Sequence, residues 1–216
     1  MAKVLNVEVV VVGGGPAGLT AAIALAGAGI ETALIARKPP ADHRTSALLA
    51  GSVAALETLG VWDACAGQAA PLRTLRIVDA TSRLIRAPEV RFTADEIGLD
   101  AFGQNIENRH LVAALDSRAA AVESLIRIEG EAVTVESRDS DVVVSTKDGA
   151  TVMARLVIGA DGRRSLCRAA AGIESVSRTY PQTALTFNLA HTRPHRDTST
   201  EFHTEQGPFT LVPLTG

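Results

Sequence analysis

The pattern of hydrophobic positions near the amino terminus changes twice within about thirty residues. Residues 9–12 are four consecutive valines, residues 13–15 are glycines, and a small, apolar stretch then continues to about Ala28. β-Branched runs favour a buried strand, glycines disfavour a helix, and Pro16 suits the first position of a new helix. The pattern therefore predicts a strand, a glycine turn and a helix over residues 16–28, followed by a second strand in residues 31–37.

The same stretch also allows a second interpretation, a membrane-spanning helix or a secretion signal. No charged residue lies between Glu8 and Glu31, and about twenty apolar residues suffice to cross a bilayer. A single spanning helix would, however, carry three glycines and Pro16 at its centre. We therefore favour the strand–turn–helix interpretation.

Further along the chain, helical and strand-like patterns alternate. Thr45 or Ser46 can cap a helix that ends at Gly60, and residues 107–122 have the spacing of a helix. Residues 72–102 and most of 175–216 are strand-like, including "TALTFNLA" and "GPFTLVPL", and Asp148-Gly149 is typical of a hairpin turn. The chain is thus predicted to be α/β.

This alternation predicts two interleaved domains. Residues 1–71 and 103–174 would form a nucleotide-binding domain, and residues 72–102 and 175–216 a mixed β-sheet domain. The second domain looks incomplete, because its last strand is followed by no closing helix, and we expect the sequence to be truncated there.

Composition and charge exclude several classes of function. The formal charge is −3 and aromatic residues make up 3% of the chain, so neither a basic surface nor a stacking platform for nucleic acid is expected. Cys65 and Cys167 lack metal-ligand spacing and are interpreted as reduced thiols of a cytoplasmic protein. Pro194 lies between His191 and His195, so we predict no metal site.

The glycine turn has the spacing G-x-G-x-x-G at Gly13, Gly15 and Gly18. In a nucleotide-binding unit the first glycine permits the turn, the second lets a pyrophosphate approach the backbone, and the third lets the helix pack on the strand. The acid that usually ends the second strand is missing, since Ala36-Arg37 stand there. Either Arg37 binds the 2′-phosphate of NADP, or the ligand is FAD held mainly by other contacts.

Four segments together resemble one family: "VVVVGGGPAGLTAAIALAGAG", "DHRTSALLAGSVAALETLGVW", "ENRHLVAAL" and "LVIGADGRRSLCR". In this order the chain resembles the single-component flavin monooxygenases of the para-hydroxybenzoate hydroxylase group. Within that group it is most similar to the aromatic hydroxylases of ubiquinone biosynthesis, of the 2-octaprenyl-6-methoxyphenol hydroxylase type. The resemblance implies a Rossmann-like FAD-binding domain of the GR2 type, interleaved with an incomplete substrate-domain sheet.

The resemblance also implies which residues hold the cofactor. A first group would bind the FAD pyrophosphate: Gly13, Gly15, Pro16, Ala17 and Gly18. A second group would contact phosphate, ribitol or flavin oxygens: Arg44, Gln104 and Arg109. The turn at Asp161 and Gly162 would lie close to the bound cofactors. No catalytic side chain is assigned, because the cofactor carries the chemistry.

The implied reaction uses FAD, NAD(P)H as electron donor and molecular oxygen to hydroxylate an aromatic ring. The implied substrate is a lipid-tailed polyprenyl phenol, with a peripheral contact at the inner membrane or with a quinone-biosynthesis complex. Two alternatives stay open: an FAD-dependent isoprenoid reductase of the same fold, and a non-catalytic nucleotide-binding module. The sequence departs from the family at Ala36, where an acid is usual, and contains no later Gly-Asp segment up to Gly216.

Overall fold

A computed structural model describes residues 4–38 and 41–215, and its contacts divide the chain into two compact units. The first comprises Met1–Ala41 and Val112–Ala184, and the second comprises Asp42–Leu111 and Leu185–Gly216. Each unit is therefore built from two separate segments of the chain. The predicted cofactor and substrate domains have other boundaries, after residues 71, 102 and 174, and their assignment stays a prediction.

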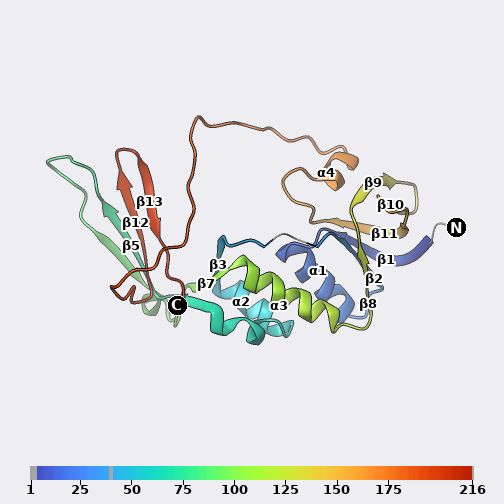
Figure 1. The fold of residues 1–216 in the computed structure, drawn as a ribbon, viewed down its shortest axis with the longest axis horizontal. Coiled ribbons are helices and arrows are strands. Elements are labelled where there is room, and N and C mark those ends of the chain that lie inside the picture. Colours follow the sequence, from blue (N-terminus) through green and yellow to red (C-terminus); the bar gives the residue numbers. More distant parts are fainter. Residues whose placement is uncertain (1–3, 39–40, 216) are drawn as a thin grey trace. The chain divides into compact units, whose positions relative to one another are not determined.

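The first unit contains a six-stranded sheet with the strand order β8-β2-β1-β11-β10-β9 (Figure 1). Its strands are β1 (Val4–Val12), β2 (Thr32–Ala36), β8 (Leu125–Glu129), β9 (Ala132–Ser137), β10 (Val142–Thr146) and β11 (Thr151–Gly159). The pairs joining β8, β2, β1 and β11 are parallel, and those joining β11, β10 and β9 are antiparallel. The sheet therefore combines a parallel part with an antiparallel extension.

The predicted βαβ unit is confirmed. Helix α1 (Pro16–Gly27) connects β1 to β2, and the buried core of the sheet includes Val10, Ala33, Val144 and Val152. The strand and the helix are thus separate elements, as the glycines predicted. No helix within residues 4–38 and 41–215 is long and apolar enough to span a bilayer.

Two more helices contribute to the first unit. Helix α3 (Asn108–Ala120) begins in the second unit and continues into the first, and α4 (Leu166–Ala170) follows β11. The helix predicted over residues 107–122 is confirmed over Asn108–Ala120, and Leu111, Leu115 and Val122 are buried. The Asp148-Gly149 hairpin is also confirmed: β10 and β11 are antiparallel and Gly149 has a φ of +86°.

The second unit contains a three-stranded and a four-stranded sheet. The first has the order β3-β7-β4, from β3 (Thr45–Leu49), β7 (Gly103–Glu107) and β4 (Ala69–Leu72). The second has the order β13-β12-β5-β6, from β13 (Gly207–Leu211), β12 (Thr198–Thr204), β5 (Thr74–Asp79) and β6 (Val90–Thr93). Helix α2 (Ala50–Thr58) and short 3₁₀ turns at Trp62–Ala64, Ala66–Gln68 and Ala94–Ile97 complete it. The mixed α/β class is confirmed.

Two local predictions in this unit are wrong. Thr45 and Ser46 do not cap a helix, because Thr45–Leu49 pairs with β7 and the helix starts only at Ala50. The predicted stop is correct, since Gly60 follows α2 with a φ of +68°. Residues 183–190 form no strand: Leu185, Phe187 and Leu189 alternate as in a strand but are exposed. Alternation alone is insufficient without a neighbouring strand to receive the backbone hydrogen bonds.

Candidate cofactor site

The glycine turn joins the end of β1 to the start of α1. Gly13 has a φ of +119° and donates a backbone hydrogen bond to the Ile35 carbonyl at 2.9 Å. A Cβ atom on Gly13 would lie 2.2 Å from the Ala160 carbonyl oxygen, and one on Gly18 would lie 1.9 Å from the Gly13 carbonyl oxygen. Both contacts are far shorter than van der Waals distance, so only glycine fits at these positions.

Gly15 differs from the other two glycines of the motif. Among the described residues, a Cβ atom built on Gly15 has no heavy atom within 4 Å apart from its chain neighbours, so no side chain covers the backbone there. No side chain caps α1, its first turn contains no acid, and Pro16 occupies its beginning, with Ala17 exposed beside it. A helix start of this kind favours an anion through its free N–H groups and its dipole. The turn therefore fits a pyrophosphate.

The turn after β11 lies beside the glycine turn in the same unit. Ala160 donates to the Val12 carbonyl at 2.8 Å, and a Cβ on Gly13 would approach the Asp161 nitrogen to 2.9 Å. Gly162 has a φ of +83°, which favours glycine. The first unit thus brings Asp161 and Gly162 close to the glycine motif.

The Asp161 carboxylate has two different oxygens. Its Oδ2 accepts from the Cys167 N–H at 3.1 Å, whereas Oδ1 is buried and has no hydrogen-bond partner within the described residues. Burial raises the pKa of Asp161, but hydrogen bonds from Ser165 and Cys167 outweigh it, so the pKa is lowered overall. Asp161 is therefore a carboxylate with one oxygen held by the start of α4.

The other predicted cofactor residues belong to the second unit. The Arg44 guanidinium, just before β3, is held by Asp42 through two hydrogen bonds of 2.9 and 2.8 Å. Arg109, at the start of α3, pairs with Glu107 at 2.9 Å, and its backbone N–H donates to the Asp42 carbonyl. Gln104 lies in β7, opposite Leu48 of β3 and Pro71 of β4, and is partly buried. Arg44 and Arg109 thus both contact Asp42, the first through its side chain and the second through its backbone.

The acids that orient these arginines were not predicted from the sequence. Asp42 and Glu107 each stand two residues before the arginine that they bind, and Asn108 donates a further hydrogen bond of 2.9 Å to Asp42. The repeated acid-x-Arg spacing was visible in the sequence. This spacing alone does not indicate an ion pair, because charged residues two positions apart are common on exposed loops.

The Asp42 carboxyl should titrate well below its ordinary pKa of 3.8, because Arg44 and then Asn108 donate hydrogen bonds to its charged form. A lowered pKa in the folded chain stabilises the fold above pH 3.8, and this contribution is lost as the pH falls through the folded pKa. Side-chain carboxyl NMR over an acid titration measures it. Arg44→Ala should return the Asp42 pKa toward 3.8, while Asp79, held at a pKa of about 2 mainly by Thr81, stays unchanged. An Asp42 pKa that is unmoved by Arg44→Ala contradicts the assignment.

A family of known proteins matches nearly the whole chain. The match is to the FAD binding domain and extends over residues 6–215. The chain belongs to the FAD binding domain family. The resemblance inferred from the glycine motif, the Arg44 segment and the Asp161-Gly162 turn is thereby confirmed.

Two relatives of the chain are hydroxylases by name, and both names refer to ubiquinone or a ubiquinol. The chain is 36% identical to "Ubiquinone hydroxylase UbiL" of Rhodospirillum rubrum, with 97% of this chain and 49% of the relative covered. It is 32% identical to "3-demethoxyubiquinol 3-hydroxylase" of Escherichia coli, with 96% and 54% covered. The chain therefore spans about half the length of the curated relatives it matches.

Solved structures of flavin monooxygenases share the fold. The Pseudomonas aeruginosa protein PqsL in complex with 2-aminobenzoylacetate superposes with a TM-score of 0.74 at 19% identity, over 98% of this chain and 58% of that one. The flavin-dependent monooxygenase PieE in complex with FAD and substrate gives 0.63 at 27% identity, over 78% and 32%. The α/β architecture of this chain is thus that of FAD-dependent monooxygenases.

Proposed function

We propose that the protein is an FAD- and NAD(P)H-dependent monooxygenase that hydroxylates an aromatic ring with molecular oxygen. The observation that carries the proposal is the bare backbone at Gly15, at the uncapped start of α1, in a chain of the FAD binding domain family. A glycine turn of this form fits a dinucleotide pyrophosphate. FAD, when bound, supplies the redox chemistry that links the nicotinamide donor, oxygen and the ring.

The residues of the chain bind and orient the cofactor in this proposal. Gly13, Gly15, Pro16, Ala17 and Gly18 form the pyrophosphate turn. Arg44 and Arg109 offer guanidinium donors to phosphate or flavin-side oxygens, with Gln104 as a further donor. Asp161 and Gly162 line the neighbouring turn. None of these residues is assigned a proton-transfer or nucleophilic role.

The proposed substrate is a polyprenyl phenol of ubiquinone biosynthesis. This extension rests on the names of the two relatives in Rhodospirillum rubrum and Escherichia coli, at 36% and 32% identity. We further propose that the protein is cytoplasmic, and that it contacts the inner membrane face or a quinone-biosynthesis complex because its proposed substrate carries a lipid tail. The isoprenoid reductase and the non-catalytic module have no observation in their favour.

Titration of the 216-residue chain with FAD tests the proposal. We expect saturable quenching of flavin fluorescence and a shifted visible spectrum. Arg44→Ala should weaken binding about tenfold, as for the loss of one hydrogen bond to a charged group. Arg127→Ala is the matched control, because Arg127 is an exposed arginine that also pairs with an acid, Asp116.

An assay of oxygen and NAD(P)H consumption then distinguishes a monooxygenase from an isoprenoid reductase. A monooxygenase consumes oxygen and NAD(P)H together and yields a hydroxylated ring. Absence of saturable FAD binding by the chain contradicts the proposal. So does substrate reduction without oxygen uptake, which indicates the isoprenoid reductase instead.

A further inference from the structure

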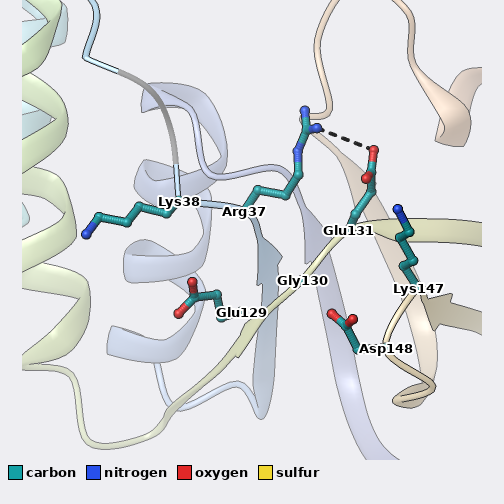
Figure 2. A pocket seen from close by; sticks show the side chains of 7 residues that line it. All are labelled: Arg37, Lys38, Glu129, Gly130, Glu131, Lys147 and Asp148. Carbon is teal, nitrogen blue, oxygen red and sulfur yellow. Dashed lines mark ion pairs between the residues drawn. The ribbon is translucent and has the colours of Figure 1, made fainter.

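A pocket of about 260 Å³ lies where β2 and β8 end in the six-stranded sheet of the first unit (Figure 2). Arg37 and Lys38 follow β2, and Glu129 and Gly130 lie at the end of β8, so this part of the pocket lies at the carboxyl ends of two parallel strands. Ligands of parallel α/β sheets bind beyond these ends. Besides Gly130, its lining is entirely charged: Arg37, Lys38, Lys147, Glu129, Glu131 and Asp148. The pocket therefore adjoins the position at which this chain carries Ala36 in place of the usual ribose-binding acid.

Glu129 is the residue of β8 that stands opposite Ala36. The parallel register pairs Ala36 with Glu129, and the Gly130 N–H donates to the Ala36 carbonyl at 3.0 Å. Paired residues of neighbouring parallel strands project from the same face of a sheet. A Cβ on Gly14 would approach the Ala36 Cβ to 2.7 Å, so the face in question is the one beside the glycine turn. Glu129 thus projects from this face, one strand away from the missing acid.

The Glu129 side chain is long enough to reach the space beside Ala36, and its carboxylate is free to bind a ligand. Neighbouring strands are about 4.8 Å apart, a gap that a glutamate side chain can bridge. Arg37 is engaged by Glu131 at 3.4 Å, and no hydrogen bond or ion pair within residues 4–38 and 41–215 involves the Glu129 carboxylate. Figure 2 shows the Glu129 carboxylate turned away from the Arg37–Glu131 pair. Its oxygens are therefore free to accept hydrogen bonds from a ligand.

We propose that Glu129 supplies the carboxylate that β2 lacks, and that it accepts hydrogen bonds from the adenosine ribose hydroxyls of the bound dinucleotide. The inference rests on the proposed function, because FAD provides that ribose. The charge of the pocket favours FAD, whose adenosine ribose carries no phosphate, over NADP. Three basic and three acidic side chains give a formal sum of zero, and a carboxylate repels a 2′-phosphate. The pocket thus favours a free ribose diol, and Arg37 is no phosphate receptor.

Calorimetric titration with ADP and with 2′-deoxy-ADP tests this role without a flavin. The 216-residue chain should bind ADP about tenfold more tightly than 2′-deoxy-ADP, because a carboxylate–hydroxyl hydrogen bond is charge-assisted. Glu129→Gln should reduce this ratio to about two. Glu131→Gln makes the same chemical change two residues away and should keep the tenfold ratio. Thermal unfolding of each variant verifies that it is folded.

A ligand with a 2′-phosphate strengthens the test. Adenosine 2′,5′-bisphosphate should bind the parent chain more weakly than AMP, which carries the same 5′-phosphate, and Glu129→Gln should reduce this difference in affinity. The inference is wrong if the parent chain binds neither ADP nor 2′-deoxy-ADP. It is also wrong if Glu129→Gln leaves the ratio of the affinities for ADP and 2′-deoxy-ADP at its parent value. FAD binding with an unmoved ratio overturns the role of Glu129 alone. A Glu129-dependent ratio in a chain that does not bind FAD overturns the proposed function alone.

Discussion

Gly15→Val is expected to abolish measurable FAD binding, by a factor of more than about one hundred, while the chain still folds. Among the described residues, a Cβ atom at residue 15 meets no heavy atom within 4 Å apart from its chain neighbours, so the valine side chain would enter open space where we expect the pyrophosphate. The backbone of Gly15 is extended, with φ −76° and ψ 175°, which valine adopts without strain. Replacing glycine by valine at this position, the residue before α1, should lower the free energy of unfolding by no more than about 1 kcal/mol.

Flavin fluorescence titration and thermal unfolding, measured on the same preparation, check the two halves of this expectation. Gly27→Val is the matched control, because Gly27 lies at the other end of α1, and a Cβ there also meets no heavy atom within 4 Å among the described residues outside its own helix turn. That variant should bind FAD as the parent chain does. If Gly15→Val binds FAD normally, the pyrophosphate does not lie at the glycine turn. A Gly15→Val chain that fails to fold would instead show that the open space at residue 15 is needed by the protein itself.

The elements predicted correctly from the sequence are those determined by neighbouring residues. The valine run, the glycines and Pro16 act within one strand–turn–helix, and each imposes its preference locally. The elements that were missed depend on distant partners. Thr45–Leu49 forms a strand because Gly103–Glu107 supplies its hydrogen bonds, and the paired residues are more than fifty positions apart in the chain. Local spacing in residues 45–56 therefore predicted a helix that starts too early.

In the candidate site, too, the features determined by neighbouring residues were predicted, whereas those that depend on distant residues were not. The roles of Gly13 and Gly18 were predicted from their spacing, and the close contacts at both positions explain why glycine is required. The pairing of Ala36 with Glu129 joins strands whose residues are more than ninety positions apart, so no motif in the sequence could indicate it. The acids that hold Arg44 and Arg109 are near in sequence, but an exposed ion pair leaves no pattern that distinguishes it from other surface charges.

Gly18→Ala should destabilise the chain strongly, although it adds a single methyl group. The new Cβ would lie 1.9 Å from the Gly13 carbonyl oxygen and 3.1 Å from the Ala160 Cβ, so α1 or the turn must move. Neither neighbour is the end of a flexible side chain, because one is backbone and the other is attached to it directly. Overpacking of this kind costs about 3 kcal/mol. For a chain of this length that lowers Tm by roughly 6 to 12 °C.

The same substitution at Gly27 separates steric conflict from helix propensity. Gly27 is in the same helix, and a Cβ there has free space, so Gly27→Ala should raise stability by roughly 0.5–1 kcal/mol through the better helix propensity of alanine. Thermal or urea unfolding of both variants measures the opposite signs. If Gly18→Ala is as stable as the parent chain, α1 does not pack against the turn at this distance. The geometry that exposes the backbone at Gly15 would then also be wrong, because the same close packing of α1 on the turn holds that backbone in place.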